Sequence, residues 1–222
     1  QRRSGPTNQG YAASSGEQFQ VFGDTPLGLV TGVTYSRSTS ASRDRLSAAA
    51  GAGGQAGVST EFRFTGESGS TEEVLGGIAN FTLNPHPNHQ LSFNTLYNRS
   101  EQKSAVFLSG RIPRDDDSRT FNRRRIEPID RTVWNLQAKG EHMLGSGGSS
   151  TPRLTWSSSY SQTTQDESDV RFFTDDFLPE RNVHRIALSV YEAPTRYFRN
   201  LKESTWSNDL SVSVPFDLGS LK

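Results

Sequence analysis

Hydrophobic and polar residues alternate with a period of two along residues 203–216. One face of this segment carries Trp206, Leu210, Val212, Val214 and Phe216, and the other carries serine, threonine and aspartate. Such alternation is typical of a β-strand whose two faces meet different environments. From Trp206 to Phe216 a strand extends roughly 34 Å, or roughly 26 Å across a membrane when tilted by about 40°, close to the ~25 Å apolar band of an outer-membrane barrel. The pattern therefore predicts a strand with one face toward lipid.

Shorter segments with the same alternation recur along the chain and pair into hairpins. The predicted strands cover residues 18–22, 27–38, 73–83, 90–98, 132–142 and 153–162. Short turns rich in glycine or proline separate them near 23–26, 84–89 and 144–152, and a further turn is predicted near 217–220. Residues 60–64 and 183–191 also favour strands, which would extend beyond the membrane. About eight strands in an antiparallel meander are expected.

Long polar segments separate the hairpins at roughly 39–72, 99–130 and 164–202. They are rich in serine, glycine, arginine and acidic residues, and they predict long loops, which are unusual in a compact soluble domain. Short turns at one end of the strands and long loops at the other are typical of outer-membrane barrels. Residues 1–222 are therefore expected to form part of one barrel domain, with short periplasmic turns and long extracellular loops.

Aromatic residues gather near both ends of the predicted strands. Near the long loops lie Tyr35, Tyr97, Trp134, Tyr160 and Trp206, and near the short turns lie Phe22, Phe81, Trp156 and Phe216. The two interfaces of a membrane select two such girdles. A soluble β-sandwich explains the alternation but neither the girdles nor the unequal connections. The predicted fold class is an all-β, transmembrane, antiparallel β-barrel segment.

Composition narrows the function classes. Hydrophobic residues make up 32 % of the 222 residues, and no apolar run is long enough for a helical membrane span. The net charge of zero leaves no basic footprint for a nucleic acid. Without cysteine, disulfides and thiol chemistry are excluded.

Two stretches resemble a known family. The stretch LGGIANFTLNPHPNHQLSFNTLYNRS at 75–100 is similar to the barrel of TonB-dependent outer-membrane receptors, in which a strand, an NP-x-H turn and a strand ending in YNRS recur. The stretch APTRYFRNLKESTWSNDLSVSVPF at 193–216 resembles the family's arginine-aromatic loop and the strand ending in PF that follows it. The resemblance implies a 22-strand barrel around an N-terminal plug, which imports scarce nutrients. With about eight strands and no recognisable plug, the chain is expected to be an internal segment of a longer receptor; a complete eight-strand barrel is the alternative.

Charged residues cluster in two of the predicted long loops: Asp115, Asp116, Asp117, Arg123, Arg124, Arg125, Asp175 and Asp176. The acidic residues could bind calcium or the cations that bridge lipopolysaccharide, and the arginines could meet phosphate groups or an anionic ligand. The alternative is a solvated loop surface on which these charges pair with one another. A ligand affinity that is unchanged after neutralising the three arginines would contradict the binding hypothesis.

The sequence gives no sign of catalysis or of a bound cofactor. His86 and His89 share the proline turn, but two imidazoles without a third ligand make a poor metal site. Neither a Ser/His/Asp arrangement nor a phosphate-binding loop in a suitable context is present. We therefore predict no enzyme activity, no metal and no cofactor.

The predicted function is that of a segment of an outer-membrane receptor that takes up a scarce ligand by energy-coupled import. Expected partners are outer-membrane lipid, the remainder of the barrel and its plug, an inner-membrane energy-coupling protein, and a small-molecule, peptide or glycan ligand. The polar strand positions expected to face plug and substrate are Asn80, Asn94, Asn135, Gln137, Lys139 and Asp209. The expected location is the bacterial cell outer membrane. The alternatives are a structural or adhesin-like barrel without transport and a soluble carbohydrate-binding β-sandwich.

Overall fold

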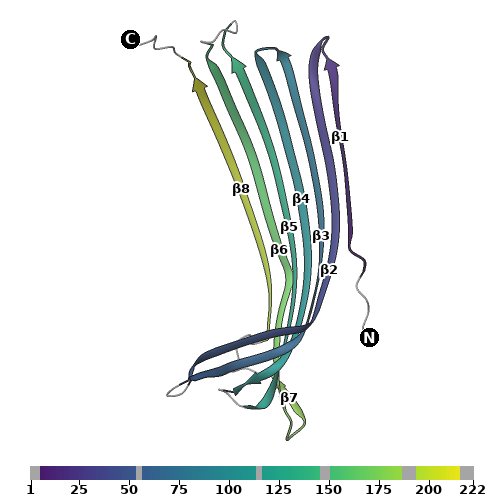
Figure 1. The fold of residues 1–222 in the computed structure, drawn as a ribbon, viewed down its shortest axis with the longest axis vertical. Helices are drawn as coiled ribbons and strands as arrows, with labels where there is room; N and C mark the ends of the chain where they lie inside the picture. Colours follow the sequence, from purple (N-terminus) through teal and green to yellow (C-terminus); the bar gives the residue numbers. More distant parts are fainter. Residues whose placement is uncertain (1–5, 54–56, 114–116, 146–150, 187–193, 216–222) are drawn as a thin grey trace, which may run out of the picture.

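The computed structural model describes residues 6–53, 57–113, 117–145, 151–186 and 194–215, which form one curved antiparallel sheet (Figure 1). Its strands are β1 (Gln9–Val21), β2 (Thr25–Gly53), β3 (Gly57–His86), β4 (His89–Ile112), β5 (Asp117–Met143), β6 (Arg153–Leu178), β7 (Val183–Ile186) and β8 (Thr195–Ser213). The predicted all-β antiparallel meander of about eight strands is confirmed. Among the described residues there is no helix with the length and apolar character needed to cross a bilayer.

Strands β1 to β6 lie side by side in chain order, and β7 and β8 share the outer edge of β6. β8 pairs with β6 between Arg153 and Phe172, and β7 pairs with it between Asp175 and Leu178. The described strands leave the sheet open, because β1 and β8 lie at opposite edges and are not paired with each other (Figure 1).

The strand register confirms the predicted faces, because residues directly opposite each other on neighbouring strands share a face of the sheet. One lateral row consists of Thr31, Ala79, Thr95, Leu136, Tyr160 and Trp206. A row nearer the short turns consists of Leu27, Leu83, Leu91, Gly140, Trp156 and Leu210. We call this side of the sheet the apolar face.

The opposite side, which we call the polar face, carries amides and hydroxyls. One of its rows consists of Asn80, Asn94, Gln137, Ser159 and Ser207, and another of Ser92, Lys139, Ser157 and Asp209. Asn135 lies on the same face, opposite Ser161. The six polar positions singled out in the sequence therefore share one side of the sheet.

The three segments predicted as long loops, 39–72, 99–130 and 164–202, are instead mostly strand, so this prediction is wrong. The hairpins simply continue, with register shifts at a few positions such as Ser42/Arg45 and Ile126/Asp130. The sequence pattern did not reveal these extensions of the strands, because both of their faces carry polar residues and hydropathy therefore does not alternate. Residues Thr60–Phe64 and Val183–Ile186 are strands as predicted. Residues 187–191 and the turn predicted near 217–220 lie outside the described residues.

The two ends of the sheet differ. At the short-turn end, compact turns join β1 to β2 and β3 to β4; at the other end, which we call the long-hairpin end, the β2–β3 hairpin bends sideways across the neighbouring strands (Figure 1). The bend encloses a small hydrophobic core of Phe64, Leu108 and Phe121, of which Phe64 is fully buried. This core fixes the position of the charged residues around it.

The β1–β2 turn contains a strained residue, which gives a first testable prediction. Phe22 has a φ of 49° and is 93 % exposed, and it precedes Gly23 at a φ of 91°. A bulky side chain is disfavoured in this left-handed region, whereas asparagine tolerates it. We expect Phe22→Asn to raise the free energy of unfolding by about 1 kcal/mol in denaturant titrations. Phe22→Ala removes the ring without favouring the backbone and serves as the control; equal stability of the two variants would contradict the strain.

Candidate functional site at the long-hairpin end

Five of the charged residues predicted from the sequence lie together at the long-hairpin end: Arg123, Arg124, Arg125, Asp175 and Asp176. β5 supplies the arginines and β6 the aspartates, and the register of the two strands brings Asn122 opposite Asp175 and Arg123 opposite Thr174. Asp115 and Asp116 lie outside the described residues. Asp117 begins β5, and its side chain is not among those described.

Asp175 is the most heavily bonded carboxylate of this end. Its side chain is only 7 % exposed; it accepts hydrogen bonds from Arg124 Nη1 at 2.5 Å and Asn122 Nδ2 at 3.0 Å, and His184 Nδ1 lies 2.8 Å from it. Burial by itself raises the pKa of a carboxyl group, but these hydrogen bonds and the Arg124 charge outweigh it and lower the pKa of Asp175. Asp175 is therefore held as a buried anion.

Asp176 is held in the same way on the neighbouring position of β6. Its side chain is 4 % exposed and lies 2.7 Å from Arg185 Nη2 and 3.4 Å from Arg119 Nη1. Because Arg185 belongs to β7, this ion pair ties β7 to the edge of β6. The pairing of acids with arginines fits the alternative weighed for the sequence, in which these charges satisfy one another.

Three consecutive arginines of β5 also lie over aromatic rings. The distances from guanidinium carbon to ring centre are 4.2 Å for Arg123 over Phe64, 5.4 Å for Arg124 over Phe107, and 5.0 Å for Arg125 over Phe172. A guanidinium within about 6 Å of a ring face is attracted by it. The arginines are thus oriented by rings as well as by carboxylates.

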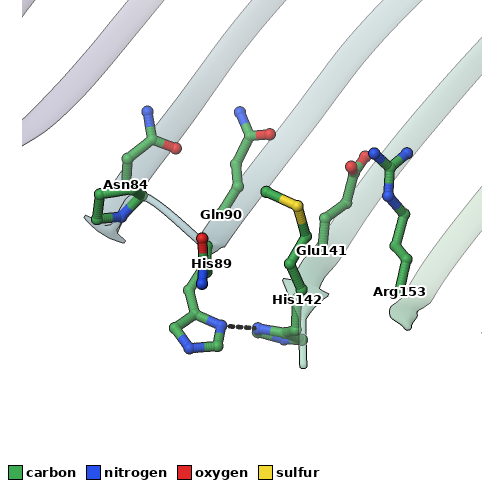
Figure 2. A pocket seen from close by; sticks show the side chains of 9 residues that line it. Asn84, His89, Gln90, Glu141, His142 and Arg153 are labelled. Atoms are coloured by element: carbon green, nitrogen blue, oxygen red, sulfur yellow. Dashed lines mark hydrogen bonds between the residues drawn. The ribbon is translucent and has the colours of Figure 1, made fainter. Parts of the chain in front are cut away.

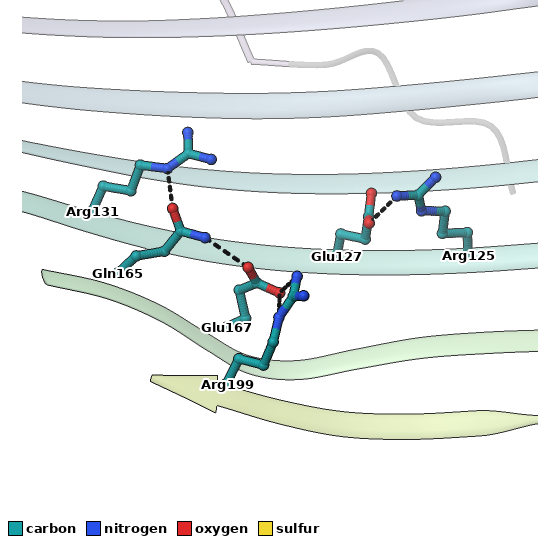
Figure 3. Close-up of polar contacts among 6 residues, drawn as sticks. All are labelled: Arg125, Glu127, Arg131, Gln165, Glu167 and Arg199. Atoms are coloured by element: carbon teal, nitrogen blue, oxygen red, sulfur yellow. Dashed lines mark hydrogen bonds and ion pairs between the residues drawn. The ribbon is translucent and has the colours of Figure 1, made fainter. Parts of the chain in front are cut away.

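A second polar network crosses β5, β6 and β8 on the polar face (Figure 3). Arg131 Nε donates to Gln165 at 2.7 Å, Gln165 Nε2 donates to Glu167 at 2.7 Å, and Arg199 Nη2 donates to Glu167 at 2.6 Å. Glu167 is buried; burial raises its pKa, but the hydrogen bonds from Arg199 and Gln165 lower it overall. The network lies where the β6–β8 register shifts, and it ties β8 to the sheet there.

A shallow groove of about 440 Å³ runs beside the arginines. It is lined by Glu67, Ser68, Gly69, Ala105, Val106, Phe107, Arg124, Arg125 and Ile126. The side chains of Arg124 and Arg125 remain 47 % and 46 % exposed despite their ion pairs. An apolar floor with guanidinium groups at its edge suits a ligand that has an apolar body and an anionic group.

The predicted aromatic residues form a row on the apolar face. Ring centres lie 6.4 Å apart for Tyr11 and Tyr35, 6.1 Å for Trp134 and Tyr160, and 5.8 Å for Tyr160 and Trp206. Tyr97 lies directly opposite Trp134 and completes the row. Tyr11 was missed in the sequence because β1 begins nine residues before the predicted strand. Trp156 lies near the short turns, and Phe216 is outside the described residues.

A row of charges follows the aromatic row on the same face, toward the long-hairpin end. Glu73, Glu101, Asp130 and Asp166 lie opposite one another on four strands. Cations offset them: Arg37 Nε lies 3.2 Å from Glu73, Arg99 Nη2 lies 2.5 Å from Asp130, and Lys103 Nζ lies 2.5 Å from Glu101. The charged row therefore interrupts the apolar face at this level, and beyond it Phe107 and Ile126 are again partly exposed on the same side of the sheet.

Comparison of the chain with models of protein families, with curated proteins and with solved structures finds no match. The interpretation of the site therefore rests on its geometry and on the sequence pattern.

Acid should loosen the long-hairpin end selectively, which gives a second prediction. The pKa values of Glu167, Asp169 and Asp175 are all lowered in the folded chain, that of Asp169 by hydrogen bonds from Arg171 and Arg196. Their stabilisation is therefore present above the unfolded pKa values, about 3.9 for aspartate and 4.3 for glutamate, and is lost as pH falls through the folded values.

Hydrogen exchange measured at about pH 7 and about pH 3, and corrected for intrinsic rates, checks this prediction. Amides of residues 165–178 should lose protection at the lower pH, while those of residues 79–83 near the short turns should keep theirs. An equal loss of protection at both ends would contradict it.

Proposed function

We propose that the chain is part of the barrel of a TonB-dependent outer-membrane receptor, which takes up a scarce ligand by energy-coupled import at the bacterial cell outer membrane. The observation that carries the proposal is the apolar face, an exposed band that ends in an aromatic row and a charged row. Large apolar side chains are exposed on this face, including Leu210 at 74 % and Trp206 at 67 %. Such a face needs an apolar environment, and lipid supplies one.

The height of the band matches a bilayer. On β4, twelve residues separate Glu101 of the charged row from His89 at the short-turn end. At about 3.3 Å per residue they span about 40 Å, and a tilt of about 40° reduces this to about 30 Å between the two polar boundaries, enough to contain the ~25 Å apolar band of an outer-membrane barrel. The aromatic row falls just inside the charged boundary, where tyrosine and tryptophan rings prefer to lie.

The open sheet implies further strands. In the described part of the chain, β1 and β8 each pair along one side only. Unpaired backbone groups are too costly in hydrocarbon, so a membrane-embedded sheet must close into a barrel. The remainder of the barrel is therefore the first partner that we propose.

The two faces then take different roles. The polar face, with Asn80, Asn94, Gln137 and their neighbours, would line the lumen and contact the plug and the passing substrate. The groove beside Arg124 and Arg125 would contact a small-molecule, peptide or glycan ligand. The force for import would come from an inner-membrane energy-coupling protein, and the chain itself would carry out no covalent chemistry.

Two other functions are distinguishable from this one. A structural or adhesin-like barrel would share the fold and the lipid-facing band but would move no ligand. A soluble carbohydrate-binding sandwich would need a second sheet over the apolar face, and all eight described strands belong to one sheet. The exposed band thus favours the membrane proposals.

The test is extraction of the native polypeptide from bacterial outer-membrane fractions, followed by measurement of its intact mass and of its solubility. We expect a folded form that requires detergent, with a mass several-fold above the 24.5 kDa of this chain. A detergent-requiring form of 24.5 kDa would favour the structural barrel. A folded form that stays in solution without detergent would contradict a membrane role.

A further inference from the structure

Three histidines meet in one row at the short-turn end. The strand register places His86 of β3 opposite His89 of β4, and His89 opposite His142 of β5. The sequence reveals only the first two as neighbours, because His142 lies 53 residues from His89 along the chain. The structure thus supplies the third imidazole whose absence made a metal site unattractive from the sequence.

The geometry of the His89–His142 pair is close to that of a metal-bound pair. Their Nδ1 atoms lie 3.1 Å apart and their ring centres 5.2 Å apart, and Figure 2 shows the two tilted rings meeting through these nitrogens at the ends of their strands. A tetrahedral ion bound at about 2.0–2.1 Å sets two imidazole nitrogens about 3.3 Å apart and their ring centres roughly 5 Å apart. The pair needs to open by only about 0.2 Å to admit an ion.

We propose that His89 and His142 bind a divalent transition-metal ion such as Zn²⁺ or Ni²⁺, for which imidazole is a preferred ligand. Among the described residues no three histidine or acidic side chains already converge on one point. The third ligand would be His86, whose ring centre lies 5.7 Å from that of His89 and whose side chain would turn toward the pair when the ion binds. Its Nδ1 accepts a hydrogen bond from the Asn88 backbone at 3.2 Å, which leaves Nε2 for the metal.

The site has room for the ion and its water ligands. His89 and His142 lie on the edge of a hollow of about 290 Å³, which the β3–β4 turn and the start of β6 also line (Figure 2). His86 is exposed at the turn and can rotate without displacing packed side chains. The proposal does not rest on the proposed function, because it depends only on these three strands.

Trp156 gives the site an optical signature. Its Nε1 donates to His142 Nε2 at 3.0 Å, and the indole N–H can only donate. In the metal-free pair, His142 therefore carries its proton on Nδ1, toward His89. A metal ion on His142 Nδ1 requires the proton to move to His142 Nε2. The N–H groups of His142 Nε2 and Trp156 Nε1 would then point at each other. Metal binding therefore breaks the Trp156–His142 hydrogen bond and changes the environment of the indole.

The experiment uses the native protein that contains this chain, extracted in detergent without a histidine tag and titrated with zinc or nickel chloride. Calorimetry should show saturable binding of one ion, accompanied by a change in tryptophan fluorescence. Calcium chloride is the control salt, because Ca²⁺ prefers oxygen ligands. Trp156→Phe should keep the calorimetric binding but lose most of the fluorescence change.

The matched variants test the ligands one at a time. We expect His89→Gln and His142→Gln each to weaken binding at least about tenfold, and His86→Gln to weaken it less. His184→Gln removes a histidine at the other end of the sheet and should leave the affinity unchanged. Circular dichroism checks that each variant folds. If His142→Gln does not fold, the affinity of His89→Gln still decides the test. An absence of saturable binding, or an affinity unchanged in His89→Gln, would overturn the proposal.

Discussion

Gly66→Ala is expected to disrupt the long-hairpin end more than any other small substitution in its strand. A Cβ atom at Gly66 would lie 2.0 Å from the backbone oxygen of Phe107 and 2.9 Å from Leu108 Cα. Neither atom can rotate away, so β3 and β4 would have to separate beside the Phe64–Leu108 contact. We expect a loss of about 3 kcal/mol or more in local stability, the upper range for overpacking.

A matched variant in the same strand isolates this effect. A Cβ at Gly69 would meet its nearest neighbour, the Ser40 backbone oxygen, at an ordinary 3.8 Å, so Gly69→Ala should be tolerated. Hydrogen exchange should show lost protection for residues 62–66 and 106–110 in Gly66→Ala only, with the short-turn end unchanged. Similar exchange in the two variants would contradict the close approach of β3 and β4.

Asp175→Asn is expected to have the second largest effect. The substitution keeps the shape of the side chain but leaves Arg124 without its buried counter-charge and removes the carboxylate that His184 contacts. Breaking a buried ion pair costs about 3–5 kcal/mol, and because Arg124 is half exposed we expect a smaller loss of about 2 kcal/mol. Denaturant unfolding at neutral pH measures the loss.

The pH dependence and a surface pair provide the controls for Asp175→Asn. As pH falls through the lowered pKa of Asp175, the wild-type carboxylate is protonated and the difference between the two proteins should shrink. Asp130→Asn breaks the exposed ion pair with Arg99 and should cost less than about 1 kcal/mol. Equal losses from the two variants, or a loss independent of pH, would contradict a buried anion.

The part of the sheet between the short turns and the charged row could be predicted from the sequence because its two faces differ in chemistry. Leu136 and Gln137 illustrate this: neighbours on β5, they fall on opposite faces, and the register confirms what alternation alone predicted. The short turns were equally visible, since glycine and proline mark them directly.

The extensions and the contacts between distant strands could not be predicted in this way. Residues 39–53 of β2 show no alternation of apolar and polar side chains, and their strand character comes from backbone pairing with β3. The Arg124–Asp175 pair and the approach of His142 to His89 depend on which strands are neighbours and in which register. A single sequence contains no local signal for either.

The central claim is that the apolar face meets lipid and the polar face does not. The chain has no cysteine, so Leu136→Cys and Gln137→Cys each provide one site for a nitroxide spin label. The labelled protein is reconstituted into lipid vesicles. We expect the label at position 136 to be relaxed mainly by oxygen, because oxygen concentrates in hydrocarbon. We expect the label at position 137 to be relaxed mainly by a water-soluble nickel complex. Equal relaxation of the two labels by the nickel complex would contradict the claim.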